Sequence, residues 1–164
     1  MRLIALIAAG LVAASAWAEP VYQWRFDADN VDEGGAFKAL TGDVPAALTG
    51  DARIEQAGYG ALVFDGEENS ALAEGVSLDA TAMTVEVWVL SATVDGSANI
   101  ASTHDGYDGF TLARESDRFT FSVAAGARGA VAAAASREPL LANEWYYVVG
   151  TFDGSQARIF VNGQ

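Results

Sequence analysis

Two neighbouring side chains of this 164-residue sequence combine residue types suited to ligand binding. Glu86 and Trp88 stand two positions apart in the run 83–90 (MTVEVWVL), where they alternate with valines. Successive side chains of a β-strand point to opposite faces, so Glu86 and Trp88 share one face if the valines occupy a core. An exposed Trp beside a carboxylate offers a sugar both a stacking surface and hydrogen-bond acceptors. The alternative, which the usual burial of large aromatics favours, is that Trp88 packs in a core.

A second group of candidate residues lies in the run 104–109 (HDGYDG), between two expected strands. Asp105 and Asp108 supply carboxylates, and Tyr107 stands between them as a further ligand-binding candidate. Calcium takes six to eight oxygen ligands, so the two aspartates would form only part of a calcium site. Asp and Gly are also common turn residues, and that interpretation of the loop is the favoured one.

Catalytic arrangements are not predicted from this sequence. Glu67 and Glu68 are adjacent, so on a strand they point to opposite faces and form no glycosidase pair. The single histidine, His104, lies in a loop and predicts no Ser-His-Asp triad. The sequence has no cysteine, which excludes a thiol nucleophile and a cysteine-ligated zinc. We therefore predict that this chain is not an enzyme.

Short alternating segments must position these side chains. They are rich in Val, Phe, Tyr, Trp and Thr and are separated by Gly and Asp-Gly, a pattern typical of an antiparallel sandwich or jelly roll. The expected strands are 21–26, 61–65, 83–90, 99–102, 109–113, 118–123, 144–152 and 157–161. The alanine-rich run 130–135 is interpreted as a strand or a loop. Residues 29–50 are expected to form a surface loop, with one short strand around 47–54.

Turn residues mark the ends of several expected strands. Phe-Asp-Gly occurs at 64–66 and at 152–154. Each time the Asp is expected to accept a hydrogen bond from a backbone N–H just beyond it, while the Gly takes a left-handed conformation. Asn162-Gly163 is the dipeptide that most readily forms a type I′ hairpin turn.

The first 18 residues resemble a secretory signal peptide. Arg2 precedes an apolar run that ends in Ala16-Trp17-Ala18, which fits the small-x-small cleavage rule. We expect a secreted, periplasmic or cell-surface protein without membrane insertion after cleavage, and one mature domain over 19–164. The formal net charge of −13 repels phosphate backbones, so nucleic acid is not an expected partner. The same charge leaves cations plausible, although solubility alone can explain it.

The order of these motifs resembles a laminin-G-like domain of the concanavalin A-like superfamily. The resemblance covers about residues 21–164, and its most specific part is 145–154 (WYYVVGTFDG) followed by 159–163 (IFVNG). It implies an all-β, antiparallel two-sheet jelly roll in which the face carrying Glu86 and Trp88 is often the concave ligand surface. The return strands that usually follow the Asn-Gly turn are missing, so the domain is expected to be truncated at its C-terminus.

The resemblance also implies a function. Laminin-G-like modules suggest non-catalytic binding of carbohydrate or of another extracellular surface component. In the related pentraxins an acidic pair in a similar loop helps to hold calcium, which is the precedent for Asp105 and Asp108. Two alternatives stay open, an accessory module of a larger polysaccharide-degrading enzyme and a structural repeat of a surface protein.

Overall fold

The computed structural model of the chain describes residues 3–6, 20–55, 60–76, 82–103, 108–125 and 130–164. Within these ranges the regular structure is β-strand apart from one 3₁₀ turn, η1 (Ala28–Asn30). The chain divides into two compact units, Met1–Val76 and Ser77–Gln164, which we call unit 1 and unit 2. The all-β, antiparallel fold class predicted from the sequence is confirmed.

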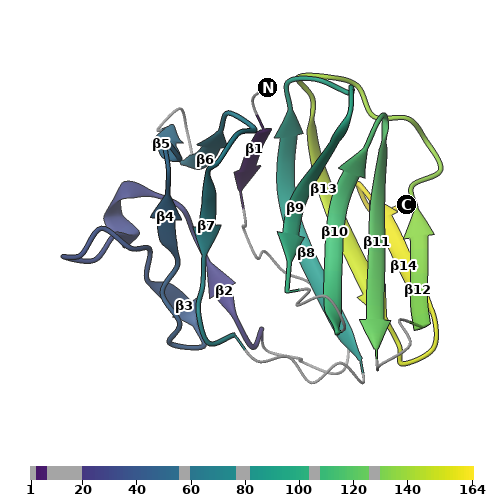
Figure 1. Cartoon of the computed structure of the whole chain (residues 1–164), viewed down its shortest axis with the longest axis horizontal. Coiled ribbons are helices and arrows are strands. Elements are labelled where there is room, and N and C mark those ends of the chain that lie inside the picture. The colour runs from purple at the N-terminus through teal and green to yellow at the C-terminus, as the bar shows by residue number, and fades with distance from the viewer. Residues whose placement is uncertain (1–2, 7–19, 56–59, 77–81, 104–107, 126–129) are drawn as a thin grey trace. The chain divides into compact units, whose positions relative to one another are not determined.

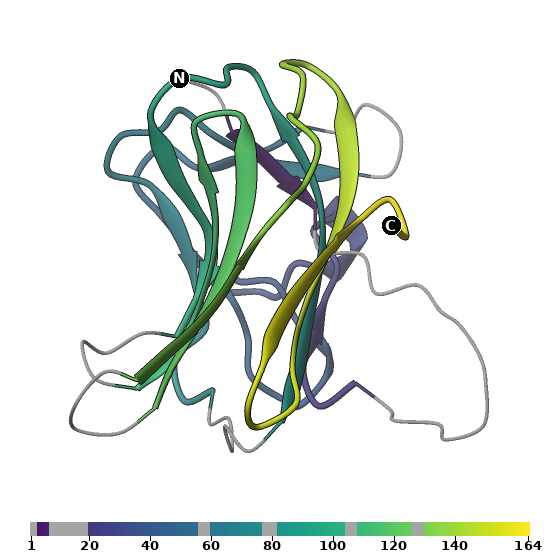
Figure 2. The same ribbon diagram turned by 90° about the vertical axis from the view of Figure 1, so that its right-hand side faces the viewer.

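Unit 2 contains two antiparallel sheets. One sheet has the strand order β14-β13-β8 and the other has the order β12-β11-β10-β9. Figure 2 shows them as separate layers, with β10 and β11 in green and β14 in yellow. Their bounds are β8 (Met83–Ser91), β9 (Ser97–Ser102), β10 (Gly109–Glu115), β11 (Arg118–Ala125), β12 (Ala130–Ala135), β13 (Trp145–Phe152) and β14 (Ala157–Val161).

Alternation of large apolar side chains along these strands builds the core of unit 2. Val87 and Val89 of β8 are buried, whereas Trp88 between them is exposed. The facing sheet buries a matching set of apolar side chains, which are Phe110, Leu112, Phe119, Phe121 and Val123. Burying large apolar side chains contributes about 1.5–3 kcal/mol each, so this alternation fixes which face of each strand turns inward.

Gly150 of β13 lies where the two sheets approach each other. A Cβ atom at this position would lie 2.8 Å from Cε2 of Phe121 and closer still to two other atoms of the same ring. Phe121 belongs to β11, so the ring of one sheet rests on the bare backbone of the other. A side chain at position 150 would therefore separate the layers or displace the ring.

One end of the β9–β12 sheet is held by a buried guanidinium. Arg114 of β10 is fully buried, and its Nη1 donates to the carbonyls of Gly96 (2.9 Å) and Ser116 (3.0 Å). Its Nη2 donates to the carbonyl of Asp95 at 3.1 Å. Burial lowers the pKa of Arg114, and the nearby Asp95 charge acts in the opposite direction. Arg114 thus joins the β8–β9 connection to the β10–β11 turn.

Unit 1 consists of short strands around a small apolar cluster. The strands are β1 (Leu3–Leu6), β2 (Gln23–Trp24), β3 (Ala39–Thr41), β4 (Ala47–Thr49), β5 (Arg53–Glu55), β6 (Ala61–Phe64) and β7 (Ser70–Leu72). They pair as β1-β6-β5, β2-β3 and β4-β7 (Figure 1). The buried cluster is formed by Phe26, Phe37, Ala46 and Leu62.

The expectation of a surface loop over 29–50 is wrong in its central part. Phe37 is fully buried, and its ring meets that of Phe26 edge to face at a centroid distance of 5.0 Å. Backbone bridges join Phe37 to Val31 and to Ala46. A single aromatic in a segment without alternation gives no periodic signal, yet burying its ring stabilises the whole segment. Strands β4 and β5 lie in or next to 47–54, where one short strand was expected.

Both predicted Phe-Asp-Gly turns are confirmed. Oδ1 of Asp65 accepts from the N–H of Glu67 at 2.8 Å, and Oδ1 of Asp153 accepts from the N–H of Ser155 at 3.0 Å. Gly66 and Gly154 follow with φ of 86° and 93°. The same conformation therefore occurs once in each unit.

The Asn-Gly turn also has the predicted conformation. Asn162 and Gly163 have φ of 51° and 83°, as a type I′ turn requires. The N–H of Val161 donates to the carbonyl of Gln164 at 2.9 Å, and the reverse bond measures 3.1 Å. Both bonds are those of a two-residue hairpin.

Strand β1 lies inside the segment predicted to be a signal peptide. It pairs with β6 in the register Leu3 to Phe64, Ile4 to Val63 and Ala5 to Leu62. The signal peptide and the single mature domain over 19–164 stay predictions. No helix in the described ranges has the length and apolarity needed to cross a bilayer.

Candidate ligand-binding face

The outer face of the β8-β13-β14 sheet carries the predicted pair Glu86 and Trp88. Both side chains point away from the valine core, as the alternation along β8 predicted. Trp88 is 38% exposed, so the alternative that it packs in the core is wrong. The indole therefore presents an accessible surface, while Glu86 is half-buried beside it.

Tyr147 of β13 completes the cluster, and sequence reasoning did not select it as a site residue. It lies directly opposite Trp88 in the antiparallel register, and its neighbour Val149 lies opposite Glu86. The rings of Trp88 and Tyr147 have centroids 5.2 Å apart and planes tilted by 32°. The Tyr147 hydroxyl donates a hydrogen bond to Oε2 of Glu86. The alternation places Tyr147 on one face of β13, but only the register with β8 brings it to Trp88.

The contact between Tyr147 and Glu86 sets the electrostatics of the cluster. Burial raises the pKa of the Tyr147 phenol, and the hydrogen bond and charge of Glu86 raise it further. The phenol is therefore neutral at physiological pH and holds its proton toward the carboxylate. With that donor occupied, the oxygens of Glu86 and Tyr147 face a ligand as acceptors.

Two further aromatic side chains extend this surface. Trp145 shares a face with Tyr147 and is 42% exposed, while Phe160 of β14 lies opposite Val149 and is 38% exposed. We call Glu86, Trp88, Trp145, Tyr147 and Phe160 together the aromatic face. Exposed large aromatics gathered on one side of a sheet are uncommon in proteins that bind nothing there.

The nearest basic residue on β14 is already paired. Arg158 lies opposite Thr151, and its Nη1 forms an ion pair with Oδ2 of Asp153 at 2.8 Å. Its Nη2 donates to Oε1 of Gln156 at 2.9 Å. The guanidinium is thus held at the β13–β14 turn.

The predicted calcium and Tyr107 sites are only partly covered by the structure. Asp105 and Tyr107 lie outside the described residues, and Asp108 is exposed next to the start of β10. In the described part of the chain, no three His, Cys, Asp or Glu side chains gather as a metal site would require. Calcium binding through Asp105 and Asp108 stays a prediction, as does the role of Tyr107.

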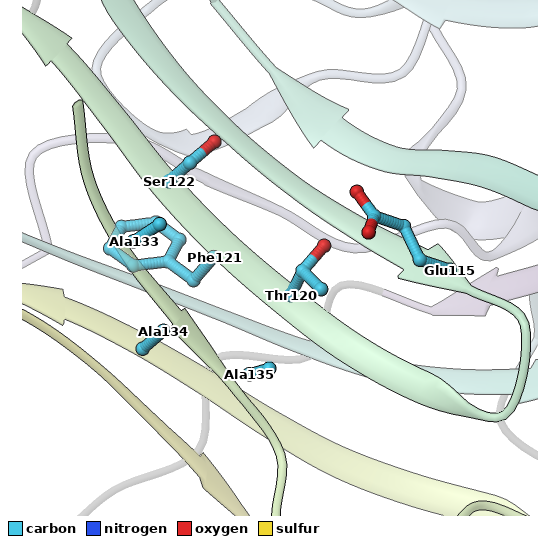
Figure 3. A pocket seen from close by; sticks show the side chains of 7 residues that line it. All are labelled: Glu115, Thr120, Phe121, Ser122, Ala133, Ala134 and Ala135. Carbon is cyan, nitrogen blue, oxygen red and sulfur yellow. The ribbon is translucent and has the colours of Figure 1, made fainter.

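The outer face of the other sheet has a different character. A hollow of about 300 Å³ is lined there by Glu115, Thr120, Phe121, Ser122, Ala133, Ala134 and Ala135 (Figure 3). Thr120 pairs with Ala135 and Ser122 with Ala133, so small side chains form its floor. We call Thr120, Ser122, Ala133 and Ala135 the small-residue face. It offers hydroxyl groups, and Glu115 adds a carboxylate beside them. The one ring in the lining, that of Phe121, is fully buried and gives a sugar no surface on which to stack.

Comparison with known proteins identifies the family. A family model of the laminin G type, described as the concanavalin A-like lectin/glucanases superfamily, matches residues 64–164. This match includes all of β8 to β14 and therefore both sheets of unit 2. The comparisons with curated proteins and with solved structures gave no match.

The strand arrangement of unit 2 agrees with this family assignment. Laminin-G-like domains are typically non-catalytic binding modules, with carbohydrate or protein ligands. The antiparallel two-sheet sandwich of unit 2 is the architecture expected of such a domain. The chain belongs to the concanavalin A-like lectin/glucanase superfamily.

Proposed function

We propose that the protein is an exported, non-catalytic binding module that recognises carbohydrate through the aromatic face. The observation that carries this proposal is the exposed Trp88 ring beside Tyr147 and the Glu86 carboxylate. Export is supported by the apolar run 3–16 and the Ala16-Trp17-Ala18 motif.

The chemistry of the cluster suits a sugar ring. A sugar has one face of C–H groups that packs on an aromatic ring, and hydroxyls at its rim that donate hydrogen bonds. The Trp88 ring supplies the packing surface, and the oxygens of Glu86 and Tyr147 supply acceptors. The side chains are held by strand pairing rather than by a loop, so little conformational entropy is lost on binding.

A glycan array tests the proposal. The complete protein is probed with and without calcium, together with Trp88→Ala. We expect a defined set of glycans to bind, and the substitution to lower the affinity for them about tenfold or more, as loss of a central Trp commonly does. The comparison with and without calcium tests the predicted contribution of Asp105 and Asp108.

Leu141→Ala is the matched control. Leu141 is 64% exposed and lies between β12 and β13, so this substitution removes exposed apolar surface outside the aromatic face. Its affinities should equal those of the wild type. Unchanged glycan binding by Trp88→Ala would remove the aromatic face from the site, and no binding to any glycan by the folded wild type would refute the proposed function.

A further inference from the structure

The aromatic face has a feature that neutral sugar binding does not require. Two electron-rich rings, Trp88 and Tyr147, lie side by side with centroids 5.2 Å apart, and a carboxylate approaches them from the same face. The face of an aromatic ring attracts cations, most strongly when the ring is that of Trp. Trp88 is 38% exposed, so its ring is accessible to such a cation.

Hydrogen bonding also favours a cationic ligand. Because the Tyr147 hydroxyl donates to Glu86, the oxygens of both side chains act as acceptors toward a ligand. A protonated amine carries three N–H donors and a positive charge, so it satisfies acceptors and the carboxylate together. A neutral acetamido or hydroxyl group at the same position satisfies the acceptors alone.

Neighbouring charges do not oppose a cation. Arg158, on the neighbouring strand pair, is held by Asp153 at 2.8 Å and by Gln156 at 2.9 Å. The formal net charge of the chain is −13, and a field of that sign raises the local concentration of cations. The net charge thus favours a positively charged ligand, while the pairing of Arg158 limits its repulsion of one.

We propose that the aromatic face selects an amine-bearing carbohydrate, in which a protonated amino group lies over Trp88 and Tyr147 and contacts the Glu86 carboxylate. This inference rests on the proposed function, since it specifies which carbohydrate the face recognises. The ring of the amino sugar packs on the indole, and the ammonium group provides the specificity.

The small-residue face supplies an internal comparison. The Glu115 carboxylate lies at the hollow lined by Thr120 and Ser122 and is exposed, whereas the one aromatic residue in the lining, Phe121, is fully buried (Figure 3). Glu86→Gln and Glu115→Gln each remove one negative charge from unit 2. Only Glu86→Gln removes a charge beside exposed rings, and its amide oxygen can still accept from Tyr147.

The experiment compares two oligosaccharides of equal length by calorimetry at mildly acidic pH. One is a β-1,4-linked glucosamine oligomer with protonated amines, and the other is the same oligomer fully N-acetylated. We expect wild type to bind the amine form about three- to tenfold more tightly at low salt, the range that a partly exposed cation–π contact and ion pair provide. High salt should reduce that preference because it screens the charge.

The variants separate the contributions. Glu86→Gln should abolish the preference, because it lowers the affinity for the amine oligomer much more than the affinity for the acetylated oligomer, which still meets an uncharged acceptor. Glu115→Gln should keep the preference. Trp88→Ala should weaken binding of both oligomers. Circular dichroism confirms that each variant is folded.

Each contrary result has a separate meaning. Equal affinity of the wild type for both oligomers would refute the amine selectivity while leaving carbohydrate binding intact. A preference that survives in Glu86→Gln would also refute it. Displacement of the amine oligomer by tetramethylammonium at the same concentration of charge would show that the face recognises an organic cation and not an amino sugar. If the folded protein binds neither these oligomers nor any arrayed glycan, the proposed function itself fails.

Discussion

The two sheets of unit 2 are alike on their inner faces and different on their outer faces. Inside, Val87 and Val89 of β8 and the phenylalanines of β10 and β11 are almost completely buried. Outside, the β8-β13-β14 sheet carries the aromatic face, whereas the β9–β12 sheet carries the small-residue face. Close packing in the core restricts which side chains the inner faces can carry, so the two inner faces are similar. The outer faces are free of that constraint, so their side chains can differ.

The largest expected effect comes from the contact that the two sheets share. Gly150→Ala places a Cβ atom against the Phe121 ring, and we expect it to lower the free energy of unfolding by about 1–3 kcal/mol, as overpacking does. Urea denaturation measures the change. Because the contact joins the sheets, the substitution should weaken the support of both outer faces.

Two further variants sharpen this prediction. Phe121→Leu in the Gly150→Ala background should recover part of the loss, since the smaller side chain leaves room for the added methyl group. Gly34→Ala in unit 1 is the control, because the nearest atom to its Cβ would be Oδ1 of Asp32 at 3.3 Å, well beyond the distances at Gly150. If Gly34→Ala lowers the free energy of unfolding as much as Gly150→Ala does, or if Gly150→Ala does not lower it, the close approach of the sheets is contradicted.

The second expected effect is a dependence of stability on alkaline pH. It arises from the Tyr147 hydroxyl on the aromatic face and should not arise from the Ser122 hydroxyl on the small-residue face. The pKa of Tyr147 is raised by burial and by Glu86, so folding favours the neutral phenol. Its contribution to stability is complete below the unfolded pKa of about 10 and is lost as the pH rises from there through the folded value. The free energy of unfolding should therefore decline above that pH, by at most about 1.4 kcal/mol per pH unit for this one group.

Tyr147→Phe should flatten this alkaline decline, measured by urea denaturation at a series of pH values. Ser122→Ala on the small-residue face removes a hydroxyl that does not titrate in this range, so it should leave the decline unchanged. If Tyr147→Phe and wild type lose stability in parallel, Tyr147 is not the group coupled to Glu86.

The smallest expected effect on stability comes from the β13–β14 hairpin, which is compared with the β10–β11 hairpin of the other sheet. The β13–β14 hairpin depends on Asp153, whose pKa is lowered first by the backbone N–H of Gln156 and then by Arg158 and Ser155. A lowered pKa stabilises the fold above the unfolded value of about 3.9, and this contribution is lost as the pH falls through the folded value. Asp153→Asn should therefore cost a small amount of stability at neutral pH and progressively less in acid.

Thermal denaturation at neutral pH and in acid measures that difference. The β10–β11 turn is held differently, by Arg114 through the carbonyl of Ser116. Ser116→Ala in that turn removes no titratable group, so its effect on stability should be the same at neutral pH and in acid. An effect of Ser116→Ala that varies with pH as strongly as that of Asp153→Asn would contradict the role given to the Asp153 carboxylate.

The sequence predicted what strand alternation determines. Val87, Trp88 and Val89 fix the faces of β8 by themselves, because neighbouring side chains of a strand point to opposite sides. The turns at Asp65 and Asp153 were equally predictable, since their chemistry lies within a few residues.

What the sequence did not predict depends on contacts between distant segments. Tyr147 meets Trp88 only through the register of β13 with β8, which no local pattern specifies. Phe37 joins the core of unit 1 without any alternation around it, so a periodic signal was absent. The predicted sites at Asp105 and Tyr107 belong to a segment outside the described residues and stay predictions.

Arg114 has a consequence for the rim of its sheet. Three carbonyl groups from two connections converge on one guanidinium, so these connections cannot rearrange separately without stranding a buried charge. The two connections are therefore ordered when the domain folds. A movement of one connection would therefore have to carry the other with it.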